Sequence, residues 1–252
     1  MIPGLDVFKD YFRDYKDNYV LIGGSALDII LEDTAIKARV TKDLDIVLIA
    51  ESMTPDFGRQ FWRFIKNGGY VNIGKSDGVP QYYRFEKPRD EAFPYQIEIL
   101  SRTGNVLIPE QQSIIPIPIG DSVSSLSAIL LDEEYYSLLP TGKEIRNDIV
   151  ILGPQYLIPF KAKAWLNLQN QKERGDHVNH HDLSKHMTDI IRLIAVLPGG
   201  IRCELSGNVI SDMTEFIKRF DKSAVDPRSM GLKGVSIEDL ISVFRAVYQS
   251  DI

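Results

Sequence analysis

The feature that most constrains this chain is a short apolar run that ends in two glycines and continues as a helical pattern. Asn18–Ile22 reads NYVLI, which is typical of a buried strand. Gly23 and Gly24 permit a tight turn, and Ser25 opens a segment with apolar residues at helical spacing, of which it is the predicted N-cap. A helix start that follows glycines is a good binding place for an anion such as a phosphate.

A second expected strand carries two aspartates on one face. It spans Asp43–Ala50, and the alternation of a strand places Asp43 and Asp45 on the same side. Glu98 lies in a further expected strand, Tyr95–Leu100, where strand pairing could bring it beside them. Converging carboxylates repel one another unless a hard cation compensates, and Mg²⁺ is the natural candidate because it prefers oxygen ligands.

Each part also has an ordinary structural explanation. A Gly-Gly-Ser sequence after a strand is more often only a turn, and an Asp-x-Asp pair can face solvent or form a salt bridge. Glu98 taken alone is an ordinary solvated strand residue. Buried aspartates are costly without partners, however, and the three parts in this order favour a functional site over chance.

The remaining pattern predicts an α+β chain: a mixed-sheet α/β core over residues 1–152, followed by a helical bundle domain over residues 153–252 that packs on the core. In the first part we expect a further helix at Phe57–Lys66 and a further strand at Gln81–Glu86. Short strands and loops are expected over Asn105–Ile151. In the second part we expect four helices, at Tyr156–Gln171, Leu183–Leu197, Val209–Phe220 and Ile237–Gln249.

Composition excludes several classes of protein. The chain has 252 residues, 44% of them hydrophobic, and a net charge of -6. It is therefore too apolar to be mainly disordered, and it has no overall positive field to coat a nucleic acid. Cys203 is the only cysteine, so an intramolecular disulfide is impossible. With no signal-like start and no apolar run of about 18 residues, we expect a cytoplasmic protein without a membrane partner.

The motifs together resemble a known family. Gly23-Gly24-Ser25 followed by Arg39-x-Thr41-x-Asp43-Leu44-Asp45 is similar to the nucleotidyltransferase superfamily with the polymerase-β-like fold, and most similar to the AbiEii/AbiGii-type nucleotidyltransferase toxins. The gap between serine and acidic pair is longer here than is usual. The resemblance continues in Lys161-Ala162-Lys163-Ala164 and in Lys185–Ile190, where His186 replaces the usual acidic residue.

The resemblance implies two sets of site residues. The catalytic and metal-binding set would be the carboxylates Asp43, Asp45 and Glu98, the last as metal ligand or base, with Lys161 reaching the triphosphate. The nucleotide-holding set would be Gly23, Gly24, Ser25, Thr41, Lys163 and Asp189. Without the resemblance, both lysines would be interpreted as solvated. Lys163 ranks second because it lies roughly on the opposite helix face from Lys161.

Zinc is not expected. His177 and His181 are four residues apart, but they lie in a polar segment with no cysteine nearby.

The leading functional hypothesis is therefore an Mg²⁺-dependent nucleotidyltransferase that moves an NMP from an NTP such as ATP to an RNA or tRNA end, or to a protein hydroxyl. As part of a toxin–antitoxin system it would have an antitoxin protein as partner. Two alternatives stay open: an enzyme that modifies a small-molecule antibiotic, and a non-catalytic nucleotide-binding or partner-binding module. The presence of Asp43, Asp45, Glu98 and Lys161 together favours catalysis.

Overall fold

The computed structural model describes residues 2–72, 82–101, 129–130, 132–220 and 225–248. These residues form two compact units. The first comprises the described residues of Met1–Glu32, Arg39–Ser127 and Lys143–Leu152, and the second those of Asp33–Ala38, Ala128–Gly142 and Gly153–Ile252. One crossing between the units falls at the expected boundary after residue 152. Segment 33–38 and the described residues of 128–142, expected in the first domain, belong instead to the second unit.

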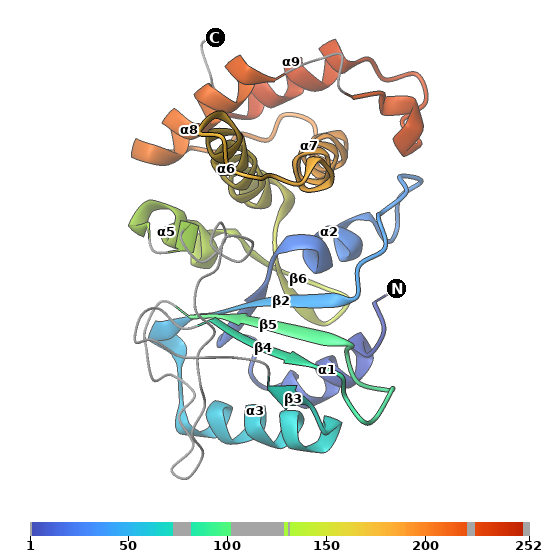
Figure 1. Ribbon diagram of the computed structural model, residues 1–252, viewed down its shortest axis with the longest axis vertical. Helices are drawn as coiled ribbons and strands as arrows, with labels where there is room; N and C mark the ends of the chain where they lie inside the picture. Colours follow the sequence, from blue (N-terminus) through green and yellow to red (C-terminus); the bar gives the residue numbers. More distant parts are fainter. Residues whose placement is uncertain (1, 73–81, 102–128, 131, 221–224, 249–252) are drawn as a thin grey trace. The chain divides into compact units, whose positions relative to one another are not determined.

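Within the described residues, a seven-stranded mixed sheet organises the first unit, in the order β3-β4-β5-β2-β1-β7-β6 (Figure 1). Its strands are β1 (Tyr19–Leu21), β2 (Asp43–Leu48), β3 (Val71–Asn72), β4 (Tyr82–Glu86), β5 (Gln96–Leu100), β6 (Lys143–Arg146) and β7 (Ile149–Leu152). β2 is parallel to β5 and β1 to β7, while the other neighbouring strands are antiparallel. The expected mixed sheet is confirmed, although Gln81, expected to start β4, lies outside the described residues.

Aromatic side chains join two helices to one face of this sheet. α1 (Leu5–Phe12) and α3 (Pro55–Gly68) lie on that face, and α2 (Gly23–Leu31) lies on the other (Figure 1). The ring of Phe8 meets Tyr19 of β1 at 5.3 Å between centroids, and Phe61 meets Phe85 of β4 at 5.8 Å. The core of the first unit is therefore strongly aromatic, which adds favourable edge-to-face contacts to the burial of apolar area.

The second unit is helical within the described residues. Its α-helices are α5 (Glu133–Gly142), α6 (Pro154–Glu173), α7 (His180–Ala195), α8 (Gly207–Arg219) and α9 (Ile237–Tyr248). The short 3₁₀ helix η3 (Pro227–Met230) also belongs to it, and η1 (Ala50–Ser52) belongs to the first unit. The four helices expected after residue 153 are confirmed to within three residues at each end.

The expectation of only strands and loops over Asn105–Ile151 is wrong for one segment. Residues 133–142 form helix α5 even though Pro140 lies inside it. Pro140 stands in the last turns, so it interrupts the hydrogen-bond ladder only near the end of the helix. Asp132 supports the other end, because its carboxylate accepts the Glu134 N–H at 2.9 Å. β6 and β7 agree with the expectation, and residues 105–128 lie outside the described part.

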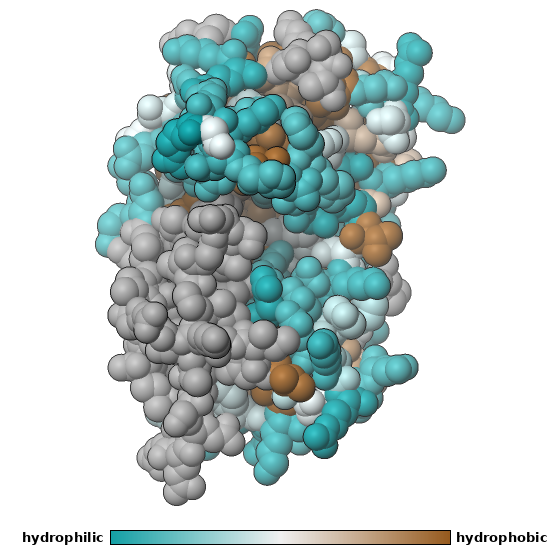
Figure 2. All heavy atoms as spheres, viewed as in Figure 1, coloured by the Kyte–Doolittle hydropathy of each residue, from teal (hydrophilic) through white to brown (hydrophobic). Residues whose placement is uncertain are grey.

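The surface of the described residues is mostly polar in the view of Figure 2. Among the described residues, the exposed large apolar side chains are those of Val40, Val71, Tyr95, Ile145 and Val243. No helix among the described residues has both the length and the apolar content that a membrane crossing requires.

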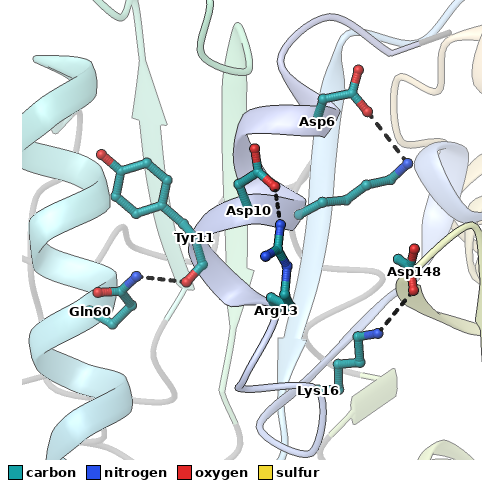
Figure 3. A network of polar contacts seen from close by, with 8 residues as sticks. Asp6, Asp10, Tyr11, Arg13, Lys16, Gln60 and Asp148 are labelled. Atoms are coloured by element: carbon teal, nitrogen blue, oxygen red, sulfur yellow. Dashed lines mark hydrogen bonds and ion pairs between the residues drawn. The ribbon is translucent and has the colours of Figure 1, made fainter.

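Exposed ion pairs surround α1 (Figure 3). Arg13 contacts Asp10 at 2.7 Å and Lys16 contacts Asp148 at 3.4 Å, with most of these side chains in solvent. Pairs of this kind contribute about 0–1 kcal/mol, because water and salt screen them. Asp10 is therefore a suitable site for control substitutions.

Replacing Phe64 by alanine should destabilise the first unit strongly. The Phe64 side chain is 0% exposed, and its ring lies 5.4 Å from Phe12 and 5.1 Å from Phe93. We expect Phe64→Ala to lower the free energy of unfolding by about 3–5 kcal/mol, measured by urea denaturation. Lys66→Ala, at an exposed position of the same helix, should change it by less than about 0.5 kcal/mol. Equal effects of the two substitutions would contradict the assigned core.

Stability should fall in alkaline solution. Burial raises the pKa of the Cys203 thiol to about 11 and that of Tyr19 to about 12, from ordinary values of 9.0 and 10.0. The unfolded chain therefore loses these protons first, so the stabilisation is complete below about pH 9 and is lost as pH rises through the folded pKa values. Urea titrations between pH 8 and pH 11 should show this decline. Cys203→Ala should remove the part that begins near pH 9, and an unchanged profile would exclude the thiol as its source.

Candidate functional site

Helix α2 begins at Gly23, two residues before the predicted N-cap. Ile22 holds the N-cap position in extended conformation, and Gly23 has φ +63°, a left-handed turn that favours glycine. Ser25 is consequently inside the first turn, where it is fully buried and donates its Oγ hydrogen to the Ile22 carbonyl at 2.9 Å. The N-cap prediction for Ser25 is wrong because the chain turns earlier. Its predicted contact with a phosphate stays a prediction.

The two glycines let an aspartate of β2 reach the start of α2. The Gly24 N–H donates to Asp45 Oδ2 at 3.2 Å. A Cβ on Gly23 would overlap the same carboxylate, so only glycine leaves room for it. Negative charge is favourable at a helix N-terminus, because the first N–H groups of the helix have no partner within it. Asp45 is thus held directly at the start of α2.

Two further polar groups lie against Gly24. A Cβ at this position would meet the Arg39 guanidinium, and would lie 3.0 Å from Thr41 Oγ1. Thr41 is therefore close to the glycine turn. Arg39 belongs to the same motif but received no role from the sequence, although its place four residues before Asp43 was the available signal. A cation and a hydroxyl beside a helix start are donors suited to a phosphate.

The register of three strands puts the predicted carboxylates in neighbouring positions. β2 and β5 pair Asp45 with Glu98, and β5 and β4 pair Glu98 with Arg84. The next row, two residues along, is also polar throughout. We call these six residues the acidic sheet face; they are Asp45, Glu98 and Arg84 in one row and Asp43, Gln96 and Glu86 in the other. The expectation that pairing brings Glu98 beside the two aspartates is confirmed.

The Glu98 carboxylate itself is engaged by its neighbours. Its Oε1 accepts from Arg84 Nε at 2.9 Å and from Gln96 Nε2 at 2.8 Å, and Arg84 Nη2 lies 2.7 Å away. In the part of the chain that the structure describes, no three His, Cys, Asp or Glu side chains are grouped so as to hold a metal ion. Neither Arg84 nor Gln96 was singled out from the sequence, because the strand register decides their role.

The donor set fits Mg²⁺ only in part. Asp43 and Asp45 are half-buried and project from the same face of β2, and Mg²⁺ commonly takes one or two protein carboxylates together with substrate phosphates. Glu98 is placed for a third ligand by its register, but its contacted oxygen points to Arg84. These residues could hold the metal through the two aspartates, with Glu98 joining only after it leaves Arg84.

Lys161 and Asp189 form a buried ion pair in the second unit. Lys161 Nζ of α6 donates to Asp189 Oδ2 of α7 at 2.8 Å, and the two residues are 4% and 0% exposed. Arg192 Nη1 lies 3.5 Å from the other carboxylate oxygen, and Arg192 Nε donates to the Lys37 carbonyl at 2.9 Å. The contact joins α6 to α7, and the role of Asp189 in orienting Lys161 toward a nucleotide stays a prediction.

Lys163 points to a different helix. Its Nζ lies 2.7 Å from Asp212 Oδ2 of α8, and the same oxygen accepts from the Tyr135 hydroxyl of α5 at 2.9 Å. Burial, and then the charge of Asp212, raise the pKa of Tyr135 well above its usual value. The sequence placed the two lysines on different helix faces, and their different partners agree with it. In this structure Lys163 joins α5, α6 and α8.

Comparison with known proteins adds little to this geometry. No family model matches the sequence, and no curated protein matches it. Among solved structures, the chain is similar to an antigenic nucleotidyltransferase-like protein from Paracoccidioides brasiliensis, with 13% sequence identity and a TM-score of 0.49. The match covers 98% of this chain and 95% of that one.

Removing the carboxylate of Asp189 should destabilise the second unit. Asp189→Ala leaves the Lys161 ammonium buried without this partner, which typically costs about 3–5 kcal/mol. Asp176→Ala is the matched control, because its pair with Arg174 at 3.7 Å is largely exposed and should contribute less than about 1 kcal/mol. Urea denaturation at pH 7 measures both. A loss no larger than that of the control would show that the buried pair does not support the helices.

Proposed function

We propose that this chain is an Mg²⁺-dependent nucleotidyltransferase that moves an NMP from an NTP to an acceptor hydroxyl. The observation that carries the proposal is the Asp45 carboxylate held at the glycine start of α2, with Asp43 beside it on the same strand face. A helix start, Arg39 and Thr41 form one polar cluster with this acidic pair. Groups that attract phosphates and groups that attract a divalent cation are thus next to one another.

Each residue of the cluster would have its own role with the metal or the phosphates. Asp43 and Asp45 would hold Mg²⁺, which when bound would offset phosphate charge and favour departure of pyrophosphate. Arg39 would add a fixed positive charge to the phosphates, because a guanidinium stays protonated and presents several donors in a plane. Thr41 would donate its hydroxyl. Gly24, which has no side chain, lets Arg39 and Thr41 approach the start of α2, where they could contact a phosphate.

The other predicted residues remain proposals from the motif resemblance. Lys161 would reach the triphosphate and Asp189 would orient it, in agreement with their ion pair. Ser25 and Lys163 would help to hold the nucleotide on the same resemblance; like Lys161, each is engaged by a neighbouring residue in this structure.

We also propose an acceptor of the AbiEii type, an RNA end such as the 3′ end of a tRNA, with a protein hydroxyl as the second choice. An antitoxin protein would then be a partner. The support for this part is the sequence motif alone.

Asp43→Asn should abolish transfer while leaving the fold intact. Asp43 is half-buried at the start of β2, and the substitution keeps its shape while it removes the charge that a metal requires. We expect labelling by radiolabelled NTPs with Mg²⁺ to fall by more than about 100-fold. Asp10→Asn, at the exposed pair of α1, should leave the rate unchanged.

The same assay identifies the acceptor. Each NTP is supplied separately, with total RNA, with protein, or with an aminoglycoside as acceptor. Label in RNA supports the proposed acceptor, and label only in the aminoglycoside supports the antibiotic-modifying alternative. If the wild type labels none of these, or if Asp43→Asn retains full activity, the transferase proposal fails.

A further inference from the structure

Arg84 lies between two glutamates of the acidic sheet face. Its Nη2 and Nε are 2.7 and 2.9 Å from Glu98 Oε1, and its Nε is 3.8 Å from Glu86 Oε1. Glu86 follows Arg84 by two residues on β4, so the alternation of the strand puts both on the same face. Arg84 therefore has one close glutamate partner and a second one within reach.

The pair is exposed enough to exchange. The side chains of Arg84, Glu98 and Glu86 are 31%, 18% and 20% exposed, so water can replace part of a lost contact. The pair of Lys161 and Asp189, at 5% and 0%, is different, because breaking it would leave buried charges. The pair of Arg84 and Glu98 has intermediate burial. It is buried enough to influence a neighbouring site, and exposed enough to be broken.

From this geometry, and on the basis of the metal site of the proposed function, we propose that Arg84 is an internal counter-ion that sets the affinity for the divalent cation. Without metal, Arg84 holds Glu98. When a dication binds at Asp43 and Asp45, Arg84 moves to Glu86 and Glu98 turns toward the metal. Arg84 is thus a positioning residue, since it acts through Glu98.

The acidic sheet face has a formal charge of −3 without metal, from four carboxylates and one guanidinium, and a bound dication would reduce it to −1. In the metal-free state Arg84 offsets one of the four acids, and the Asp45 charge is stabilised at the start of α2. After the exchange, Arg84 offsets Glu86, and the other three carboxylates face two positive charges. Gln96 Nε2 donates to Glu98 at 2.8 Å and can keep that contact while Arg84 leaves, because the amide carries no charge. Arg84 and Glu86 should therefore influence metal binding in opposite directions.

Mn²⁺ binding in the absence of nucleotide tests this directly, by calorimetry and by electron paramagnetic resonance of the unbound ion. Arg84→Met removes the competitor for Glu98, so we expect Mn²⁺ to bind about ten-fold more tightly. Glu86→Gln removes the second partner of Arg84, so binding should weaken several-fold. Adding Glu98→Gln to Arg84→Met should cancel the gain. Arg63→Met, an exposed arginine of α3 on the other face of the sheet, controls for net charge and should change nothing.

The outcomes separate this inference from the proposed function. If the wild type transfers nucleotides but Arg84→Met binds Mn²⁺ no more tightly, or Arg63→Met produces the same gain, the counter-ion role is overturned and the transferase stands. If Arg84→Met and Glu86→Gln shift Mn²⁺ affinity in opposite directions while no acceptor is labelled, the role stands and the transferase fails. Thermal unfolding checks that each variant is folded. Arg84→Lys, which keeps the charge but loses the planar two-nitrogen contact, should give an intermediate gain.

Discussion

The contact between Asp45 and the start of α2 is the constraint on which the rest of the first unit's polar cluster depends. It requires glycine at position 23, because a side chain there would overlap the carboxylate and the backbone has a positive φ. It also joins β2 to the β1–α2 turn through the Gly24 N–H. Part of the positive end of α2 is therefore already used by the protein's own carboxylate. Additional attraction for a phosphate has to come from Arg39 and Thr41, which lie against Gly24.

Burial distinguishes two charged pairs of the described residues from one another. The pair of Lys161 and Asp189 is almost inaccessible to solvent and joins two helices, so its main effect is to hold these helices together. The pair of Arg84 and Glu98 is partly accessible and has a second acid within reach, so it can take part in equilibria with ions. Net charge alone does not distinguish these two pairs. They differ in the exposed fraction of their side chains and in whether a second acid lies within reach.

The sequence predicted most of the regular structure because its signals are local. Alternation placed Asp43 and Asp45 on one face, and periodicity placed Lys161 and Lys163 on different helix faces. The helix at α1 was not assigned, and α5 was interpreted as strands and loops, because α1 is short and Pro140 argues against a helix. The exact start of α2 was also missed, since it depends on Asp45, which lies 21 positions from Gly24 along the chain.

Long-range register was harder to predict. That Glu98 could pair beside the aspartates was foreseeable, but its bonds to Arg84 and Gln96 depend on how β4 aligns with β5. No short motif carries that alignment. Arg39 was visible in the motif, yet its closeness to Gly24 depends on the path of the chain into β2. The contacts that are hardest to predict are therefore those between polar side chains from separate segments of the sequence.

The interleaving of the two units along the chain affects how the protein can fold and be dissected. Segment 33–38 belongs with the helical unit, where the Lys37 N–H donates to the Met230 carbonyl at 3.4 Å across nearly two hundred residues. During synthesis this segment leaves the ribosome long before its partners exist, so the helical unit cannot be completed until the chain is almost finished. A fragment of residues 153–252 would also lack α5 and the hydrogen bond that the Tyr135 hydroxyl donates to Asp212. Each unit is built from several separate segments of the chain, so neither can be produced as one continuous fragment.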